Sequence, residues 1–325
     1  MTPDEQYALV AEAALAPSVH NVQPARWRFA GDGVILFEDA TRRLPAGDPT
    51  ARDAATSLGA AAEGLAIALS RSGRRLVDRG ATDLPAPEGD LLPQRRFGIE
   101  PGTGADPLGP YVADRRSHRG TFAAPNEAQR RAAAALAADD LAVVSAPDAI
   151  ARIAVEVDRA GHRFFRDDAF RRELLSWMRL RRRDPRWAKD GLNADAMAMS
   201  RVEAVGAGLV MGPLFRPLDR VGLAAPLTAE AAKIRSATAI ALFHRPHGEA
   251  RFDSGRAFYR AWLRIAAAGL GGAVMAALAD DPAAAASVAA HLPAGRELVS
   301  AWRVGPVPAD AACPRARIAV DRLIV

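Results

Sequence analysis

Helical and strand-like patterns follow one another along the chain without a regular alternation. In some segments apolar residues recur at the spacing of a helix, and in others they occupy every second position. The patterns predict helices at residues 3–16, 51–72, 126–138, 147–160, 164–182 and 255–268, and strands at residues 26–39 (as a hairpin), 95–99, 141–145, 237–244 and 299–304. A doubly wound parallel sheet needs strands and helices in strict turn, so the order predicts an α+β fold.

The length of the chain predicts more than one packed unit. At 325 residues it exceeds the size at which a single hydrophobic core usually stops growing, roughly 250–300 residues. Residues 79–110 are rich in proline and glycine and read as a connector, which gives a first half at 1–110 and a second half at 111–325. Residues 184–227 show no sustained period and many glycines and prolines. A lid and a disordered insertion are the two interpretations, and the methionines there favour a lid.

Composition argues against several classes of protein. Charged residues, glycine or proline interrupt every apolar stretch before the ~20 residues that a membrane span needs, so no membrane partner is expected. The first residues, MTPDEQYALVAEAALAP, carry acids where a secretory signal carries bases. Cys313 is the single cysteine, and no Cys/His cluster has zinc spacing. We therefore expect neither an internal disulfide nor a metal site, and a reducing cytoplasm.

The basic residues and nucleotide-like motifs do not indicate a nucleic-acid or dinucleotide site. The net charge is +5, and the densest basic run, MRLRRRDPRW at 178–187, is better explained as a solvated helix end than as a nucleic-acid patch. GAGLVMG at 206–212 follows no convincing strand and precedes a proline, which excludes the Rossmann fingerprint. No P-loop and no GxSxG turn occur.

Two polar segments remain, far apart in the chain. APSVHNVQP at 16–24 places a hydroxyl, an imidazole and two carboxamides between prolines, and RRSHRGTF at 115–122 concentrates arginines around a serine. The first resembles the APSxxNxQPW loop of the FMN-dependent nitroreductase family, and its histidine before the asparagine is most similar to the Acg branch. The second resembles the arginine-serine segment with which such flavoproteins begin. Residues 48–69, 255–275 and the closing AWRVGPVP and CPRARI agree with the family in the expected order.

The order of the two motifs is itself informative. The resemblance implies an interlocked homodimer in which RRSxR precedes APSxxN, each flavin lying between one motif of each subunit. Here the first half has the loop without a preceding RRSxR, and the second half has RRSHR without a second loop. The sequence thus predicts two tandem nitroreductase-like halves that form an intramolecular pseudo-dimer, with one FMN between them.

The resemblance also implies which residues touch the cofactor. Forked guanidinium donors suit a phosphate dianion, and amides and hydroxyls suit the polar edge of the ring. The expected phosphate ligands are Arg115, Ser117, Arg315 and Arg317; Arg119 lies nearer the pyrimidine edge; Ser18, His20, Asn21 and Gln23 face the ring; and the backbone of Val274 and Met275 approaches N5. Taken singly, Ser18 and Asn21 could be capping residues, and Arg315 and Arg317 surface residues. Ala25 stands where the family loop usually has tryptophan.

The expected function is that of an FMN-dependent oxidoreductase, moving hydride or electrons between the flavin and a small nitro compound, quinone or specialised metabolite. The chemistry is expected on FMN, so no catalytic side chain is named. NAD(P)H is a candidate donor, and the chain could be a monomer or a homodimer. The alternatives are a flavin-sequestering protein whose lid covers the cofactor, and an arginine-rich binding module without cofactor.

Overall fold

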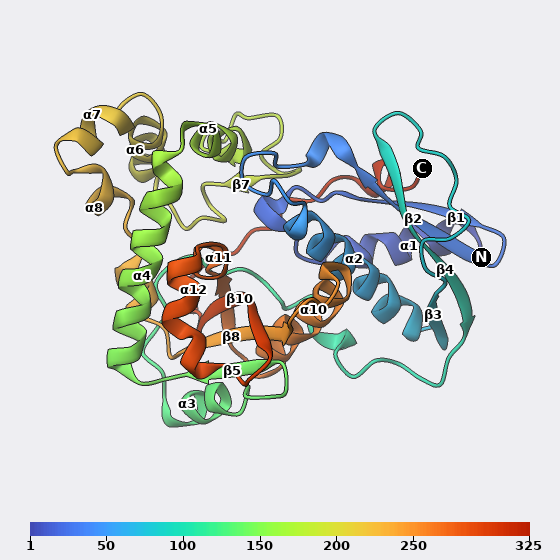
Figure 1. Cartoon of the computed structure of the whole chain (residues 1–325). Helices are drawn as coiled ribbons and strands as arrows, with labels where there is room; N and C mark the ends of the chain where they lie inside the picture. Colours follow the sequence, from blue (N-terminus) through green and yellow to red (C-terminus); the bar gives the residue numbers. More distant parts are fainter.

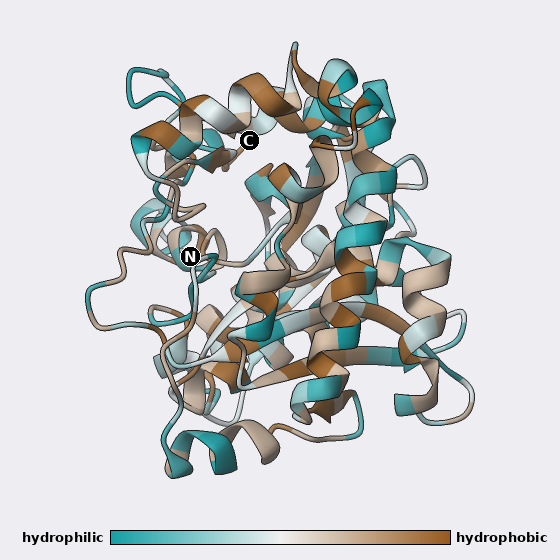
Figure 2. Cartoon of the chain, turned by 90° about the vertical axis from the view of Figure 1, so that its left-hand side faces the viewer, coloured by the Kyte–Doolittle hydropathy of each residue, from teal (hydrophilic) through white to brown (hydrophobic).

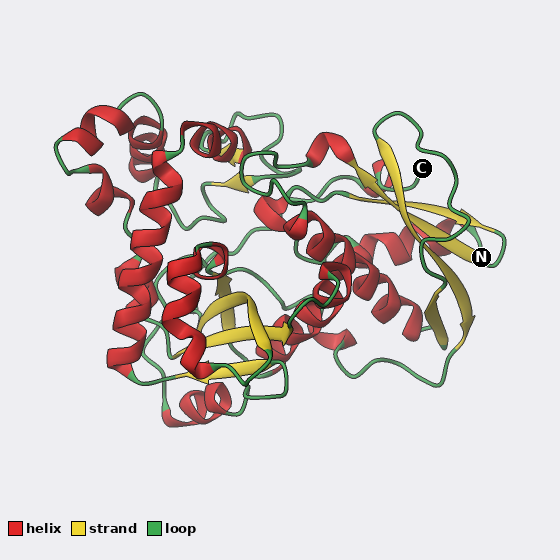
Figure 3. Cartoon of the chain, in the orientation of Figure 1, coloured by secondary structure: helices red, strands yellow, loops and turns green.

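The computed structural model describes residues 1–325 and has the α+β architecture that the sequence predicts (Figures 1 and 3). Its strands form two antiparallel four-stranded sheets. The first sheet contains β1 (Ala25–Ala30), β2 (Gly33–Asp39), β3 (Arg74–Asp78) and β4 (Leu91–Pro101), and the second contains β5 (Leu141–Val144), β8 (Ala239–Pro246), β9 (Gly271–Val274) and β10 (Arg296–Gly305).

The two sheets have the same strand order. The first runs β1-β2-β4-β3 and the second β5-β8-β10-β9, and all neighbours in both are antiparallel. In each sheet a long helix connects the second strand to the third: α2 (Arg52–Ser70) in the first and α10 (Arg251–Ala267) in the second. A helix also precedes each sheet, α1 (Pro3–Ala13) and α3 (Glu127–Ala134). The chain thus contains the same arrangement twice.

Helices α2 and α10 pack against each other where their glycines meet. A Cβ atom on Gly59 would overlap the carbonyl oxygen of Phe252, and one on Gly255 would overlap that of Thr56. The backbones can approach this closely because both positions lack a side chain. Glu63 adds a buried link on the same interface, accepting from Arg256 at 2.8 Å and from Arg260 at 2.9 Å.

Residues 145–238 form a helical insertion between β5 and β8, on the left of Figure 1. It contains α4 (Pro147–Arg166), α5 (Asp168–Trp177), β6 (Met178–Arg179), β7 (Leu192–Asn193), α6 (Arg201–Met211), α7 (Phe215–Arg220), α8 (Ala224–Thr228) and α9 (Ala231–Arg235). The expectation of irregular structure throughout 184–227 was wrong. A capping box between Ser200 and Glu203 starts α6, whose interior accommodates glycines that read as breakers.

The C-terminal segment returns to the first sheet after β10. The amide of Trp27 donates to the carbonyl of Leu323 at 2.7 Å, and the amide of Val325 donates to the carbonyl of Trp27 at 2.8 Å. The last residues therefore cover the β1 edge of the first half. Two short helices, α11 (Ala276–Asp280) and α12 (Pro282–Val288), precede β10.

Most expected elements are present, with displaced ends. The hairpin at 26–39 and the strands at 141–145, 237–244 and 299–304 are confirmed. The connector contains more strand than expected, because β4 covers eleven residues and pairs on one side with β3, which the sequence did not predict. No helix is both long and apolar enough to span a bilayer.

Candidate functional site

The loop at 16–24 has an unusual backbone. His20, Asn21 and Gln23 adopt φ angles of 43°, 55° and 53°, a region that non-glycine residues seldom occupy. Neighbouring hydroxyls hold the turn, since Ser18 Oγ accepts the amide of Gln23 at 2.9 Å and Ser57 Oγ accepts that of Val19 at 3.1 Å. A conformation of this kind persists where the surroundings fix it, and such places are often binding sites.

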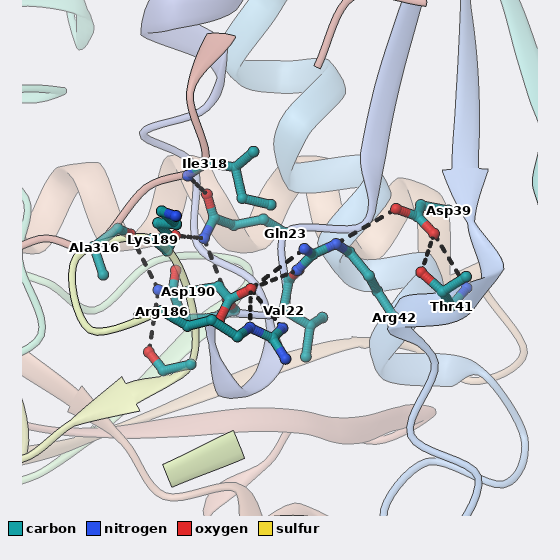
Figure 4. A network of polar contacts seen from close by, with 12 residues as sticks. Val22, Gln23, Asp39, Thr41, Arg42, Arg186, Lys189, Asp190, Ala316 and Ile318 are labelled. Atoms are coloured by element: carbon teal, nitrogen blue, oxygen red, sulfur yellow. Dashed lines mark hydrogen bonds and ion pairs between the residues drawn. The ribbon is translucent and has the colours of Figure 1, made fainter. Parts of the chain in front are cut away.

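The two carboxamides of the loop bind distant parts of the chain (Figure 4). Asn21 Nδ2 donates to the carbonyls of Gly191 and Ala316, at 3.2 and 3.1 Å. Gln23 Nε2 donates to the carbonyl of Lys189 at 2.9 Å, and its Oε1 accepts the amide of Ile318 at 3.0 Å. The loop therefore joins the insertion to the C-terminal segment. Contact of these amides with a flavin ring stays a prediction.

A buried carboxylate fixes the insertion beside the loop. Asp190 is 2% exposed and accepts from Arg186 at 2.6 Å and Arg42 at 3.2 Å (Figure 4). It also accepts from Arg179 at 2.9 Å. Burial alone would raise the pKa of Asp190, but hydrogen bonds from Arg186 and Arg179 outweigh it and lower the pKa. The carboxylate therefore stays ionised and neutralises part of the positive charge of these three arginines.

Arg115, Arg315 and Arg317 converge next to the loop, and we call them the arginine cluster. Arg115 Nη2 donates to the carbonyl of Leu15 at 2.8 Å, and its guanidinium lies 4.6 Å from the ring centre of Trp262. Arg317 donates to the carbonyl of Ala14 at 2.6 Å, and Arg315 to that of Ala113 at 2.7 Å. Their protein acceptors are neutral carbonyl and amide oxygens, and none of the three forms an ion pair.

Burial makes this cluster electrostatically costly. Desolvation lowers the pKa of Arg115 to about 10 and that of Arg317 to about 9, and the cations also lower one another's pKa. A buried cation without an anionic partner costs several kcal/mol. The cluster therefore carries the unneutralised positive charge that is typical of an anion-binding site.

Unpaired polar atoms in the cluster support the same conclusion. Arg115 Nε and Arg315 Nε are buried and have no hydrogen-bond partner, and the buried hydroxyl of Tyr259 has no partner at good hydrogen-bond geometry, although the guanidinium of Arg115 lies close to it. Tyr259 is fully buried on α10, and burial raises its pKa, so it is a neutral donor. Buried polar groups are normally satisfied, and these donors suit a multiply charged oxyanion such as a phosphate ester.

A second cationic group lies beside His20. Desolvation, and then the nearby charge of Arg119, lowers the pKa of His20 to about 4, so the imidazole is neutral at pH 7. Burial also lowers the pKa of Arg119, whose hydrogen-bond acceptor is the carbonyl of Ala196 at 3.4 Å. The loop of the first half thus lies near the RRSHR segment.

The RRSHR segment also contacts β9 of the second half. Ser117 and Gly272 form a parallel bridge, and the amide of His118 donates to the carbonyl of Gly272 at 3.0 Å. At the end of β9, Val274 is 38% exposed, whereas Met275 is 5% exposed. The structure therefore places Ser117 beside the glycine-rich strand. Whether Val274 and Met275 approach a ring atom stays a prediction.

Sequence reasoning missed two groups in this region. Tyr259 lies within an apolar helical pattern, and such a pattern does not reveal that a hydroxyl is unpaired. Residues 189–191 carry no motif, although their backbone meets both loop amides. The tryptophans 27, 177, 262 and 302 are all buried in the core.

Comparisons with known proteins give limited information on this chain. No family model and no curated protein matches it. It is similar to the FMN-bound nitroreductase of Bacteroides fragilis NCTC 9343 at 11% identity, over 64% of this chain and 92% of that one, with a TM-score of 0.35. It is also similar to the FMN-dependent nitroreductase NfnB of Mycobacterium smegmatis, solved with NADPH, at 19% identity. The match covers 66% of this chain and 90% of that one, with a TM-score of 0.36. The FMN- and NADPH-dependent nitroreductase NfnB of sphigopyxis sp. strain HMH gives 17% identity, coverages of 67% and 97%, and a TM-score of 0.38. Likenesses this weak define neither the fold nor the ligand of the chain.

Proposed function

We propose that this chain is an FMN-dependent oxidoreductase of nitroreductase-like architecture, related to the Acg branch, with one FMN between its two halves. The observation that carries the proposal is the arginine cluster: three guanidiniums without an ion pair, beside a buried tyrosine hydroxyl that has no well-formed hydrogen bond. A phosphate dianion would satisfy these donors through charge-assisted hydrogen bonds, each contributing roughly 1.5–3 kcal/mol. The residues present therefore fit the phosphate end of FMN.

The repeated architecture supports a site between the halves. Two sheets of identical strand order, joined through α2 and α10, are what a fused pair of related subunits would contain. Arg115 contacts the first half at Leu15, and Ser117 contacts the second half at Gly272. This composite arrangement favours one FMN per chain.

The remaining predicted residues would orient the ring. FMN, when bound, supplies hydride or electron transfer to a small organic substrate, with NAD(P)H as the proposed donor. Arg119 would place a cation beside the ring, and the neutral His20 would add no second charge there. Residues 184–227 would act as a lid that Asn21, Gln23 and Asp190 hold against the loop. We place the activity in the cytoplasm, where Cys313 would stay reduced.

A flavin titration tests this proposal. The purified protein, stripped of ligand, should take up one equivalent of FMN per chain and then show the absorption bands of oxidised flavin. NADPH should bleach those bands without oxygen, and a nitro compound or quinone should restore them. A protein that takes up no FMN would overturn the proposal, and two equivalents would contradict the single composite site. If the absorption bands of bound FMN change with neither NADPH nor the nitro compound or quinone, the protein is not an oxidoreductase of this kind.

A further inference from the structure

Helix α6 has an apolar face that packs against nothing. Val202, Val205 and Leu209 are 82%, 62% and 47% exposed, and their spacing of three and four residues places them on one side of the helix. On the other side, Ala204 and Met211 are buried. The helix is therefore apolar on two sides, and one of them faces solvent.

Further exposed apolar residues lie in and next to α7 and α8. Seven of the thirteen exposed large hydrophobic residues lie within residues 202–227, so the exposure is concentrated here. We call the seven residues the α6–α8 face: Val202, Val205, Leu209, Leu214, Val221, Leu223 and Leu227. Figure 2 looks onto this side of the molecule, with hydrophobic and hydrophilic segments mixed along the helices at the top. A concentration of exposed apolar residues in one part of a folded protein is typical of an interaction site.

Arginines without ion pairs occur in the same part of the chain, with Arg201 at the start of α6 and Arg220 at the end of α7. Arg181, Arg183, Arg201 and Arg220 are exposed. A Cβ atom on Gly208 of α6 would lie 3.1 Å from Leu180, so the run that follows Leu180 is adjacent to α6. Most of the nearby carboxylates already have partners within the protein. Glu203 caps the start of α6 through Ser200. Asp219 forms ion pairs with His162 and Arg166, and Asp168 forms ion pairs with Arg171 and Arg216. The surroundings of the face are therefore basic.

We propose that the α6–α8 face binds the surface of a membrane that contains anionic lipids. Valine and leucine side chains would enter the boundary between headgroups and acyl chains, and the arginines would meet lipid phosphates. Helices α6–α8 lie at a corner of the molecule, at the end away from both termini (Figure 1), so a flat surface can reach them. The sequence predicted no membrane partner because its apolar stretches are too short for a membrane span, and that criterion does not address binding to a membrane surface.

The charge distribution favours a membrane over a second copy of the chain. In a symmetric dimer the same patch faces itself, so the arginines around it would meet arginines. Like charges across an interface oppose association, whereas anionic lipid attracts them. The proposal is independent of the flavin site, because none of the residues of the face contributes to the arginine cluster.

Vesicle flotation with the full-length protein tests the proposal. The protein should float with phosphatidylglycerol vesicles and much less with phosphatidylcholine vesicles, and added salt should weaken binding. The variant V205E/L209E should bind at least about tenfold more weakly, since it places charge in the apolar contact. The variant R181E/R183E should also bind more weakly, because it reverses two of the four charges that attract anionic lipid. The control Tyr7→Glu, at a 50% exposed residue on α1, should bind like the wild type.

Two results would overturn the proposal. One is a wild-type protein that does not float with anionic vesicles. The other is a wild-type dimer in solution that V205E/L209E converts to a monomer, which would assign the face to a second copy. Circular dichroism of each variant confirms that the substitutions at these exposed positions leave the fold intact.

Discussion

Arg317 Nη1 donates to Asn21 Oδ1 at 3.0 Å, joining residues that lie 296 positions apart. The same guanidinium donates to the carbonyls of Ala14 and Leu15. The C-terminal segment thus packs directly against the loop at 16–24 and the residues before it. A single side chain completes both the loop and the proposed phosphate site.

Replacing Arg115 should weaken FMN binding without unfolding the protein. Arg115→Ala removes one charge-assisted contact and should raise the Kd for FMN about tenfold to a hundredfold. Fluorescence quenching during FMN titration measures this. Arg130→Ala, at an exposed position on α3, is the control and should leave the Kd unchanged. If the wild type and both variants bind FMN with equal Kd values, Arg115 does not contact the cofactor.

The hydroxyl of Tyr259 should matter only when the ligand is present. In the ligand-free chain the hydroxyl has no well-formed hydrogen bond, although Arg115 lies close to it, so Tyr259→Phe should change the Tm of that form only slightly. With FMN bound, the variant should lose a hydrogen bond to a charged group, and its Kd should rise about tenfold or more. Thermal unfolding with and without FMN measures both effects. A lower Tm in the ligand-free variant would show that the hydroxyl is structural.

Asp190 should be essential for stability. Asp190→Asn leaves Arg42, Arg179 and Arg186 around a neutral amide, and removal of one partner from a buried ion pair costs about 3–5 kcal/mol. Urea unfolding measures the loss. Asp195→Asn is the control, because its ion pair with Arg182 is largely exposed, and it should cost less than about 1 kcal/mol. Similar losses in the two variants would contradict the assigned role of Asp190.

His20 should make the ligand-free protein less stable at mildly acidic pH. Its folded pKa of about 4 lies below its ordinary value of 6.5, so between these values the unfolded chain binds the extra proton. The free energy of unfolding should therefore fall as the pH drops from 6.5 to 4, by at most about 3 kcal/mol from this residue. His20→Asn should remove that contribution, since asparagine tolerates the positive φ. His247→Asn, at an exposed histidine, should keep it. Parallel pH profiles for wild type and His20→Asn would refute the assignment.

The close contact between α2 and α10 should not tolerate an added methyl group at Gly255. Gly255→Ala places a Cβ atom on the carbonyl of Thr56 and should destabilise the protein by about 1–3 kcal/mol. Gly206→Ala on α6 is the matched control, because nothing lies within 4 Å of its Cβ position. It should be neutral or stabilising by up to about 1 kcal/mol, owing to helix propensity. A drop in Tm for Gly255→Ala alone would confirm the contact.

Local signals in the sequence predicted much of the fold. Thr2 and Pro3 mark the start of α1, where Thr2 forms a capping box with Glu5, and the glycine turn at residue 31 produces the hairpin. Strand β9 was not predicted, because a short glycine-rich segment becomes a strand only through its pairing with β10. The site shows the same limit: the motifs brought attention to Asn21 and Arg115, but their partners depend on contacts across 170 and 100 residues.

The return of the C-terminal segment to the first half sets the timing of folding during synthesis. Domains generally fold from the N-terminus as the chain emerges from the ribosome. The first sheet and α2 can form early, but the β1 edge at Trp27 stays uncovered until residues 323–325 have emerged. Arg315 and Arg317 arrive equally late, so nascent chains lack two of the three cations that would hold the cofactor. Loading with FMN should therefore follow the emergence of Arg315 and Arg317, and a chain stalled before residue 323 would expose an open sheet edge to chaperones.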